Sequence, residues 1–121
     1  MSNAIVITID GPSGTGKGTI CCRLACLMKW NFLDSGALYR VLAVAAERNH
    51  IKNKDEIELI NLADKLDVKF NMRKSGSVAE VSFNGEIVTD EIRTEACGKA
   101  ASIISPIAGV RKALLKRQRA F

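Results

Sequence analysis

Hydrophobic positions in the first third of the chain follow the pattern of an α/β protein. Residues 4–9, Ala-Ile-Val-Ile-Thr-Ile, are largely β-branched and almost continuously apolar, which predicts a strand buried on both faces of a parallel sheet. A Gly-rich loop follows at residues 10–16. Apolar residues then recur at helical spacing from near Lys17 for about 12 residues, and again over residues 37–48. Between these helices, residues 30–33 are compatible with a second short strand.

The pattern changes in the middle of the chain. Residues 55–66 keep a helical pattern, and apolar and polar side chains then alternate over residues 68–72 and 80–83, as in half-exposed strands. The Asn-Gly pair at 84–85 is typical of a type I′ turn, because both central residues of that turn have positive φ. It predicts a return strand at residues 86–88. Together these segments predict a small antiparallel sheet, different in kind from the first strand.

Two more helices are predicted in the remainder of the chain. Asp90 is placed to cap a helix that runs to about Ile104. Ser105 and Pro106 mark the start of the last helix, with the serine as N-cap and the proline as the first helical residue. No Gly or Asn ends this helix before Phe121.

The composition is that of one globular domain. The chain has 121 residues, of which 47% are hydrophobic and 26% charged. No apolar run reaches the roughly 18 residues of a membrane span, and the N-terminus lacks the features of a secretory signal. We therefore expect a cytoplasmic protein without a membrane partner. The 4 cysteines lack metal-ligand spacing, and we expect them to act as small apolar side chains in a reducing compartment.

The net charge of +5 lies in one segment. Residues 105–121 contain no acid, and their basic residues are Arg111, Lys112, Lys116, Arg117 and Arg119. Acids and bases balance in the rest of the chain. A local basic cluster fits a phosphate-bearing partner, either a nucleotide or a nucleic acid. The alternative interpretation is a solvated helix face.

The segment Gly-Pro-Ser-Gly-Thr-Gly-Lys fits the phosphate-binding pattern G-x-x-x-x-G-K. Glycines let successive N–H groups point at phosphate oxygens, and the following helix N-terminus favours an anion. Lys17 adds a positive charge for the β- and γ-phosphates. Gly18 stands where the general pattern has Ser or Thr, so Thr19 carries the hydroxyl best placed for Mg²⁺. The candidate nucleotide-binding residues are Gly11, Pro12, Ser13, Gly14, Thr15, Gly16, Lys17, Gly18 and Thr19. An ordinary Gly-rich turn is the alternative, but the expected flanking strand and helix favour nucleotide binding.

Longer stretches resemble the cytidylate kinases of bacteria, within the nucleoside monophosphate kinases. They are the loop Gly-Pro-Ser-Gly-Thr-Gly-Lys-Gly-Thr, Leu-Asp-Ser-Gly-Ala-Leu-Tyr-Arg at 33–40, Ala-Ala-Ser at 100–102, and residues 110–121. The resemblance covers the whole chain, and the stretch at 34–40 is its most specific part. It implies a P-loop kinase fold of the α/β class, a parallel sheet flanked by helices. The small antiparallel strands correspond to an insert that the bacterial members carry in their monophosphate-binding region.

The resemblance also implies an activity, transfer of the γ-phosphoryl group of ATP to CMP or dCMP with Mg²⁺. Lys17 would act as the catalytic residue on the ATP phosphates, and Thr19 would lie near the metal. The implied monophosphate-binding residues are Asp34, Ser35, Arg40, Ser102 and Arg111, with Ser102 at the cytosine and Arg111 on a phosphate. Blander alternatives remain for single residues: Ser35 as a helix cap, Arg40 as a surface charge and Ser102 as an ordinary helix serine.

The chain departs from the family pattern in its length. The family continues for about as many residues again, with an Asp-Gly-Arg-Asp strand and an arginine-bearing lid. We therefore expect residues 1–121 to be an incomplete kinase domain, with the monophosphate-binding region and its insert at about 52–104, and without measurable turnover alone. The whole protein is expected to be a monomer that does not bind nucleic acid.

Two other functions remain open. One is a non-catalytic nucleotide- or RNA-binding module that uses the loop and the basic helix. It lacks an aromatic stacking platform, because Trp30 and Tyr39 are isolated. The other is a P-loop kinase for a different small acceptor, such as shikimate or another nucleoside monophosphate.

Overall fold

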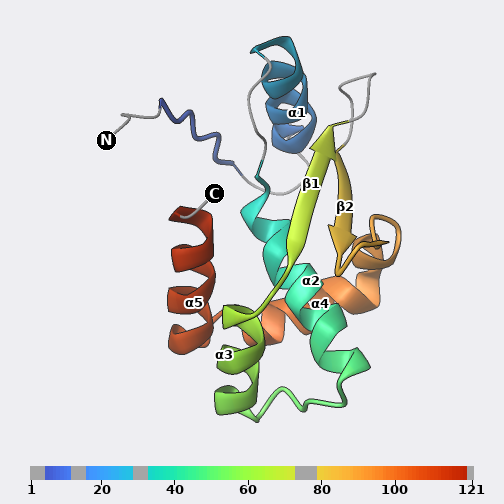
Figure 1. Ribbon diagram of the computed structural model, residues 1–121, viewed down its shortest axis with the longest axis vertical. Coiled ribbons are helices and arrows are strands. Elements are labelled where there is room, and N and C mark those ends of the chain that lie inside the picture. Colours follow the sequence, from blue (N-terminus) through green and yellow to red (C-terminus); the bar gives the residue numbers. More distant parts are fainter. Residues whose placement is uncertain (1–4, 12–15, 29–32, 73–78, 120–121) are drawn as a thin grey trace. The chain divides into compact units, whose positions relative to one another are not determined.

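The computed structural model describes residues 5–11, 16–28, 33–72 and 79–119 (Figure 1). The chain divides into two compact units. The first comprises residues 1–32 and 72–79, and the second comprises residues 33–71 and 80–121.

In the first unit, the helix predicted after the Gly-rich loop is confirmed as α1, Lys17–Met28. Gly16 has φ +82°, a left-handed conformation that suits glycine, and its carbonyl accepts the first helical bond from the Ile20 N–H at 3.1 Å. The helix buries Cys22 and Ala25. The conformation of Gly16 thus marks the point where the loop turns into the helix.

The prediction of a buried strand at residues 4–9 is wrong for the part that the structure describes. Residues 5–10 have no regular structure, and the side chains of Ile5 and Val6 are 77% and 76% exposed. A strand of a parallel sheet is buried only when strands and helices cover it, and no described strand pairs with this segment. The short strand expected at residues 30–33 falls mainly on residues outside those the structure describes.

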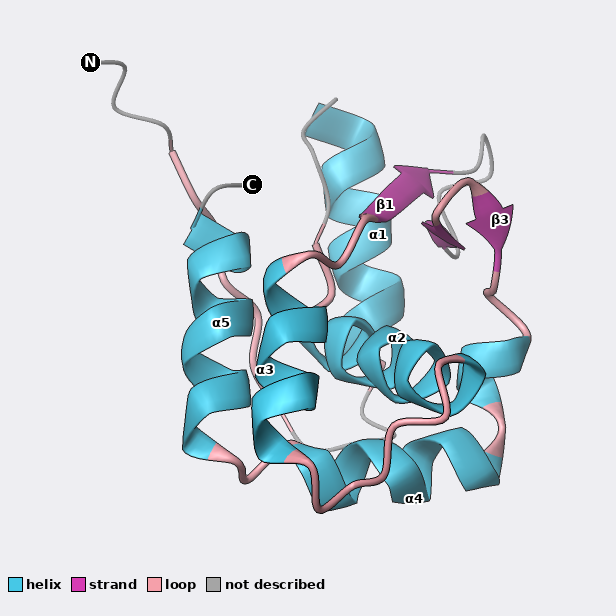
Figure 2. Cartoon of the chain, turned by 60° about the horizontal axis from the view of Figure 1, so that its bottom comes forward, coloured by secondary structure: helices cyan, strands magenta, loops and turns pink. Residues whose placement is uncertain are grey.

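The second unit is built around α2, Ser35–Arg48. It packs against α4, Glu95–Ile104, while α3, Glu56–Asp64, lies along α5, Ala108–Arg119 (Figure 2). The most deeply buried large side chains are Leu42, Leu59, Leu66, Ile104, Leu114, Val41, Val88 and Val110. These residues come from all four helices and the adjoining segments, so the helices share one hydrophobic core.

The ends of α2 are fixed by local hydrogen bonds. Asp34 is the N-cap, and its carboxylate accepts the Ala37 N–H at 3.2 Å. At the other end, His50 has φ 56°. Its N–H donates to the carbonyl of Glu47 at 3.1 Å, and the Ile51 N–H donates to that of Ala46 at 2.9 Å. These two bonds form a Schellman motif, which explains why the helix stops close to the predicted end.

The predicted hairpin is confirmed. β2, Ala79–Phe83, pairs antiparallel with β3, Glu86–Ile87, and Phe83 lies opposite Glu86. Asn84 and Gly85 have φ of 51° and 81°, as a type I′ turn requires. β1, Val68–Met72, joins them in the order β1-β2-β3. The parallel sheet implied by the resemblance is not among the residues that the structure describes.

The helix expected to begin at Asp90 is interrupted. Residues Glu91–Arg93 form a short 3₁₀ helix, η1. Thr94 then adopts an extended conformation, and its hydroxyl accepts the Cys97 N–H at 3.1 Å, so Thr94 rather than Asp90 caps α4. Asp90 makes no side-chain cap. A hydroxyl that accepts an N–H three residues ahead favours a new helix start at this point.

The prediction that Ser105 is the N-cap of the last helix is also wrong. Ser105 has helical φ and ψ, and its N–H donates to the carbonyl of Ala101 at 2.9 Å, so it belongs to the end of α4. The Ile107 N–H donates to the Ile104 carbonyl at 3.1 Å, and α5 begins at Ala108. The tight turn after α4 uses the residues that sequence alone assigned to the next helix. Within the described ranges, no helix is long and apolar enough to cross a membrane.

Candidate nucleotide-binding residues

The phosphate-loop residues are described at both ends of the loop. Lys17 is the first residue of α1, and its side-chain ammonium donates to the carbonyl of Gly11. The lysine ammonium therefore lies at Gly11, the first residue of the loop. No acidic residue lies in the first turn of α1. No negative side chain in that turn therefore neutralises the positive N-terminal end of the helix dipole. Candidate residues 12–15 lie outside the described residues.

Thr19 lies in the first turn of α1, and its side chain is exposed. A hydroxyl oxygen is a hard ligand of the kind that Mg²⁺ accepts, with phosphate oxygens and water completing the shell. In the described part of the chain, no group of three or more His, Cys, Asp or Glu could hold a metal. Thr19 therefore presents an exposed hydroxyl in the first turn of α1, next to Gly18, which has no side chain.

In the second unit, Asp34 and Ser35 lie at the start of α2. The Asp34 carboxylate caps the helix, whereas Ser35 is the first helical residue and is exposed. The capping role that the sequence offered to Ser35 therefore belongs to Asp34. The hydroxyl of Ser35 lies on the surface of the first turn of α2.

Arg40 is a half-buried residue of α2 rather than a loose surface charge. Its guanidinium Nη1 donates to the carbonyl of Ile92 in η1 at 2.8 Å. The Nη2 atom lies against α4, because a Cβ placed on Gly98 would be only 3.3 Å from it. The absence of a side chain at Gly98 lets the guanidinium approach the backbone of α4.

Ser102 is brought to the same place. It lies one turn after Gly98 on α4, and its exposed hydroxyl donates to the Gly98 carbonyl at 2.9 Å. Nη2 of Arg40 and the hydroxyl of Ser102 therefore both lie near Gly98. The sequence predicted both residues as candidates but not their common proximity to Gly98, because Arg40 lies on a different helix.

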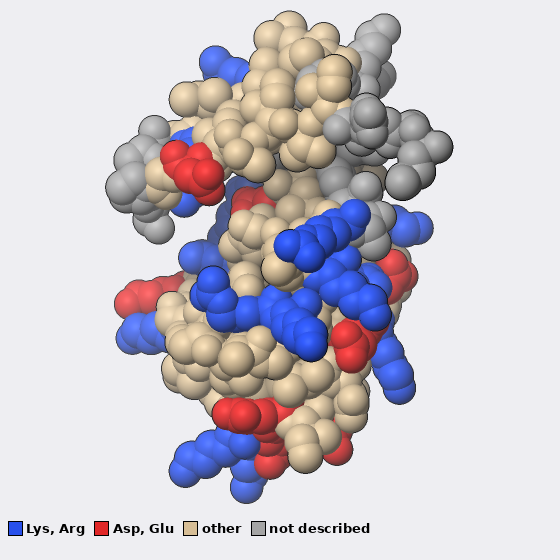
Figure 3. Space-filling view, turned by 90° about the vertical axis from the view of Figure 1, so that its left-hand side faces the viewer, with Lys and Arg blue, Asp and Glu red and all other residues tan. Residues whose placement is uncertain are grey.

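Arg111 is exposed on α5. Figure 3 looks from the side on which α5 lies and shows several Lys and Arg side chains gathered there. In the described contacts, nothing joins Arg111 to Arg40 or Ser102. Arg40 and Ser102 thus each lie near Gly98, and Arg111 lies on the basic helix α5.

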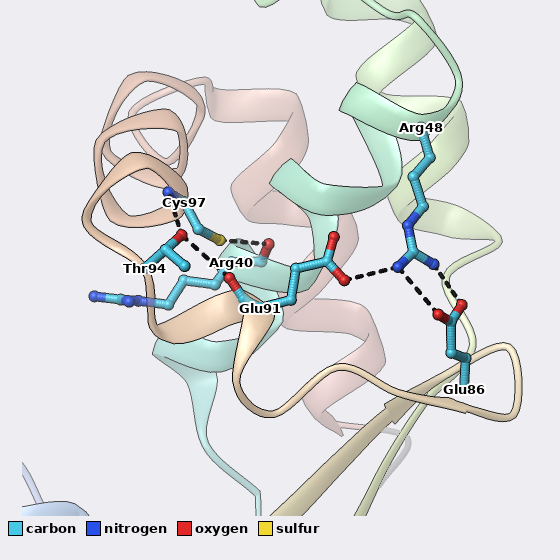
Figure 4. A network of polar contacts seen from close by, with 6 residues as sticks. All are labelled: Arg40, Arg48, Glu86, Glu91, Thr94 and Cys97. Carbon is cyan, nitrogen blue, oxygen red and sulfur yellow. Dashed lines mark hydrogen bonds and ion pairs between the residues drawn. The ribbon is translucent and has the colours of Figure 1, made fainter.

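A polar network beside this site was not predicted (Figure 4). Arg48, the last residue of α2, makes ion pairs of 2.7 Å with Glu86 of β3 and with Glu91 of η1. The hydrogen bond that Arg48 donates to Glu86 and the charges of both acids raise the pKa of Arg48. The sequence could not reveal this network, because Glu86 and Glu91 lie 38 and 43 residues from Arg48 along the chain.

Cys97 connects α4 to α2. Its thiol donates to the backbone carbonyl of Arg40 at 3.4 Å. Burial raises the pKa of Cys97, and the nearby charge of Arg40 only partly opposes this. The thiol therefore stays protonated and keeps its role as a donor at neutral pH.

Comparison with known proteins decides the family. Residues 7–121 match the family model described as cytidylate kinase. The chain belongs to the cytidylate kinase family. It is 52% identical over 118 residues to a cytidylate kinase of Pectobacterium carotovorum strain PC1, covering 98% of this chain and 52% of that protein. It is 53% identical over 116 residues to one from Nitrosococcus oceani, covering 96% of this chain and 51% of that protein.

A cytidylate kinase of Escherichia coli O9:H4 is similar in the same way, with 52% identity over 98% of this chain and 51% of its own length. The chain thus spans about half the length of the curated cytidylate kinases it matches. The family resemblance read from the loop and from residues 33–40 is confirmed. The expectation that members of the family are about twice as long as this chain is also confirmed.

Proposed function

We propose that this chain supplies the ATP-binding and monophosphate-binding residues of a cytidylate kinase, which phosphorylates CMP or dCMP with ATP. The observation that carries the proposal is the contact of the Lys17 ammonium with the Gly11 carbonyl. It places the Lys17 ammonium at Gly11, the first residue of the loop whose backbone would hold the phosphates. A simple Gly-rich turn has no need of a lysine that folds back in this way.

The ATP phosphates would lie between the loop amides and the N-terminus of α1. The helix dipole and the Lys17 ammonium both favour negative charge there. Thr19 would contribute its hydroxyl to Mg²⁺, which when bound would neutralise charge on the β- and γ-phosphates. The chain's own residues supply the binding and the alignment.

The monophosphate would be held in the second unit by Arg40. A guanidinium has five N–H donors in a planar fork, and the Ile92 carbonyl engages Nη1. The other N–H donors of the guanidinium remain for an anion, and Nη2 lies beside Gly98 of α4. Ser102, one turn further along α4, offers a hydroxyl for the base. Asp34, Ser35 and Arg111 are proposed as further acceptor contacts.

Phosphoryl transfer of this type needs no covalent intermediate. Its rate depends on the alignment of the acceptor oxygen with the γ-phosphoryl group and on positive charge around the transferred group. Lys17 and the two arginines would supply that charge. Exclusion of water would protect ATP from hydrolysis.

The test is CMP-dependent ADP release by the protein at its natural length. We expect Lys17→Met to abolish turnover, whereas Lys52→Met, which removes an exposed lysine in the loop after α2, leaves it unchanged. Arg40→Met should raise KM for CMP about tenfold to a hundredfold, the usual cost of losing a hydrogen bond to a charged group. KM for ATP should not change.

Two outcomes would contradict the proposal. If UMP, AMP or shikimate were phosphorylated and CMP were not, the acceptor would be wrong. If no acceptor were phosphorylated and the protein instead bound RNA with a steep salt dependence, the non-catalytic alternative would replace it.

A further inference from the structure

Two arginines of α2 hold the same short 3₁₀ helix. Arg40 donates from Nη1 to the carbonyl of Ile92 at 2.8 Å. Arg48, two turns later on α2, contacts the carboxylate of Glu91, the preceding residue, with Nη2 at 2.7 Å. η1, whose Ile92 carbonyl orients the Arg40 guanidinium, is thus attached to α2 by the Arg48 side chain as well.

A series of hydrogen bonds through Thr94 and Cys97 also connects η1 to α2 (Figure 4). The Thr94 hydroxyl donates to the Glu91 carbonyl at 3.2 Å and accepts the Cys97 N–H at 3.1 Å. The Cys97 thiol in turn donates to the Arg40 carbonyl at 3.4 Å. Both the main chain and the side chain of Arg40 are therefore fixed against the turn whose start Arg48 holds.

We infer that Arg48 is a positioning residue for the acceptor site: by holding Glu91 it fixes the Ile92 carbonyl, which orients the Arg40 guanidinium. The inference rests on the proposed function in that Arg40 is taken to bind the monophosphate. Arg48 itself contacts no candidate acceptor residue in the described structure. It acts only through η1.

An arginine suits this task better than a lysine would. Its fork contacts Glu86 with Nη1 at 2.7 Å while Nη2 contacts Glu91 at 2.7 Å. The guanidinium carbon also lies 5.9 Å from the centre of the Phe83 ring, within range of a cation–π contact. A lysine ammonium is a single point charge and cannot keep this planar geometry.

The two acids allow the inference to be separated from a general loss of stability. Glu86 attaches the β2–β3 hairpin to Arg48, whereas Glu91 attaches η1. If Arg48 acts on Arg40, then loss of Glu91 matters to the acceptor and loss of Glu86 matters much less. A merely structural role would make both losses alike.

The experiment compares variants at the protein's natural length. Arg48→Met and Glu91→Gln should each raise KM for CMP about threefold to fivefold, the range typical of one partly exposed ion pair, with kcat and KM for ATP unchanged. Arg48→Lys should recover part of the loss. Glu86→Gln should stay close to the wild type. Lys99→Met, which removes the exposed 3.7 Å pair with Glu95 on α4, serves as the matched control.

A second measurement does not depend on the substrate. In ¹⁵N-labelled protein, the Arg40 Nε–H signal should shift and broaden in Arg48→Met and Glu91→Gln, and should be unchanged in Lys99→Met. An unchanged Arg40 signal in Arg48→Met overturns the inference whether or not CMP binds. So does equal loss of CMP affinity in Glu86→Gln and Glu91→Gln. If the wild type does not use CMP, the proposed function fails, while the Arg40 signal still decides the role of Arg48.

Discussion

Replacing Gly109 with alanine is expected to destabilise the fold, although alanine favours helices more than glycine does. α3 and α5 approach closely at this residue. A Cβ on Gly109 would lie 2.3 Å from Cδ1 and 2.9 Å from Cγ1 of Ile60. Carbon atoms are at their best about 3.5–4.0 Å apart, so the Ile60 side chain must rotate or the helices must separate.

The expected magnitude follows from two opposing terms. Alanine gains about 1 kcal/mol over glycine inside a helix. Forcing an extra methyl group into a packed interface costs about 1–3 kcal/mol. Gly109→Ala should therefore lower the free energy of unfolding by about 1 kcal/mol. In an Ile60→Ala background the obstructing atoms are gone, so the same substitution should raise the free energy of unfolding by about 1 kcal/mol.

The assay is urea unfolding of the four proteins of this cycle, followed by far-UV circular dichroism. The decisive result is the reversal of sign, which corresponds to a coupling of about 2 kcal/mol between Gly109 and Ile60. If Gly109→Ala stabilises both backgrounds equally, the close approach of α3 and α5 does not exist in solution.

Three further predictions concern single polar groups. Thr89→Val should lower the free energy of unfolding by about 1–3 kcal/mol in urea titrations, because the buried Thr89 hydroxyl accepts the Val81 N–H at 2.9 Å; Thr89→Ser should cost much less. Asp34→Ala should cost about 1 kcal/mol in the same assay, since the Ala37 N–H loses its cap, and Asp34→Asn should recover most of it. Burial raises the pKa of Cys97 above its usual 9.0, so stability that is fully present below pH 9 should fall as pH rises further. Unfolding curves of Cys97→Ala should lack this loss, and an equal loss in both proteins would refute the assignment.

Sequence predicts those parts of this fold whose cause is local. The Asn-Gly pair fixed the hairpin because few residues tolerate positive φ at both positions, and Asn84 and Gly85 have it. The helical pattern of α2 was read correctly because apolar residues recur at helical spacing along it and are buried. The last helix was also read correctly as a helix, although its start was not. Nothing beyond neighbouring residues is needed for either inference.

Helix starts in the last third were misread because several residues competed for the same role. Asp90, Thr94 and Ser105 are all good N-cap residues by type. Thr94 serves because its hydroxyl also donates to the Glu91 carbonyl, which ends the 3₁₀ turn that packs against α2. The tertiary contact of that turn with α2 favours Thr94 over Asp90 as the start of α4.

In the candidate site too, local motifs were predictable from the sequence and long-range contacts were not. Arg40 and Ser102 were identified from motifs, but the Ile92 carbonyl that holds Arg40 is 52 residues away, and no pattern links a side chain to a carbonyl at that distance. The strand expected at residues 4–9 was wrong for a related reason. Its apolar pattern predicts burial only if covering strands exist, and the described residues supply none.

The way each cation is held separates the candidate phosphate ligands from the structural arginine. Lys17 and Arg40 donate to main-chain carbonyls, those of Gly11 and Ile92. A carbonyl is neutral, so each cation keeps its full charge for an anion. Arg48 contacts two carboxylates, so its cluster carries net negative charge and would repel phosphate. The arginine with the best hydrogen bonds is therefore the one least suited to bind a nucleotide, which is why its effect on the acceptor has to pass through Glu91 and η1.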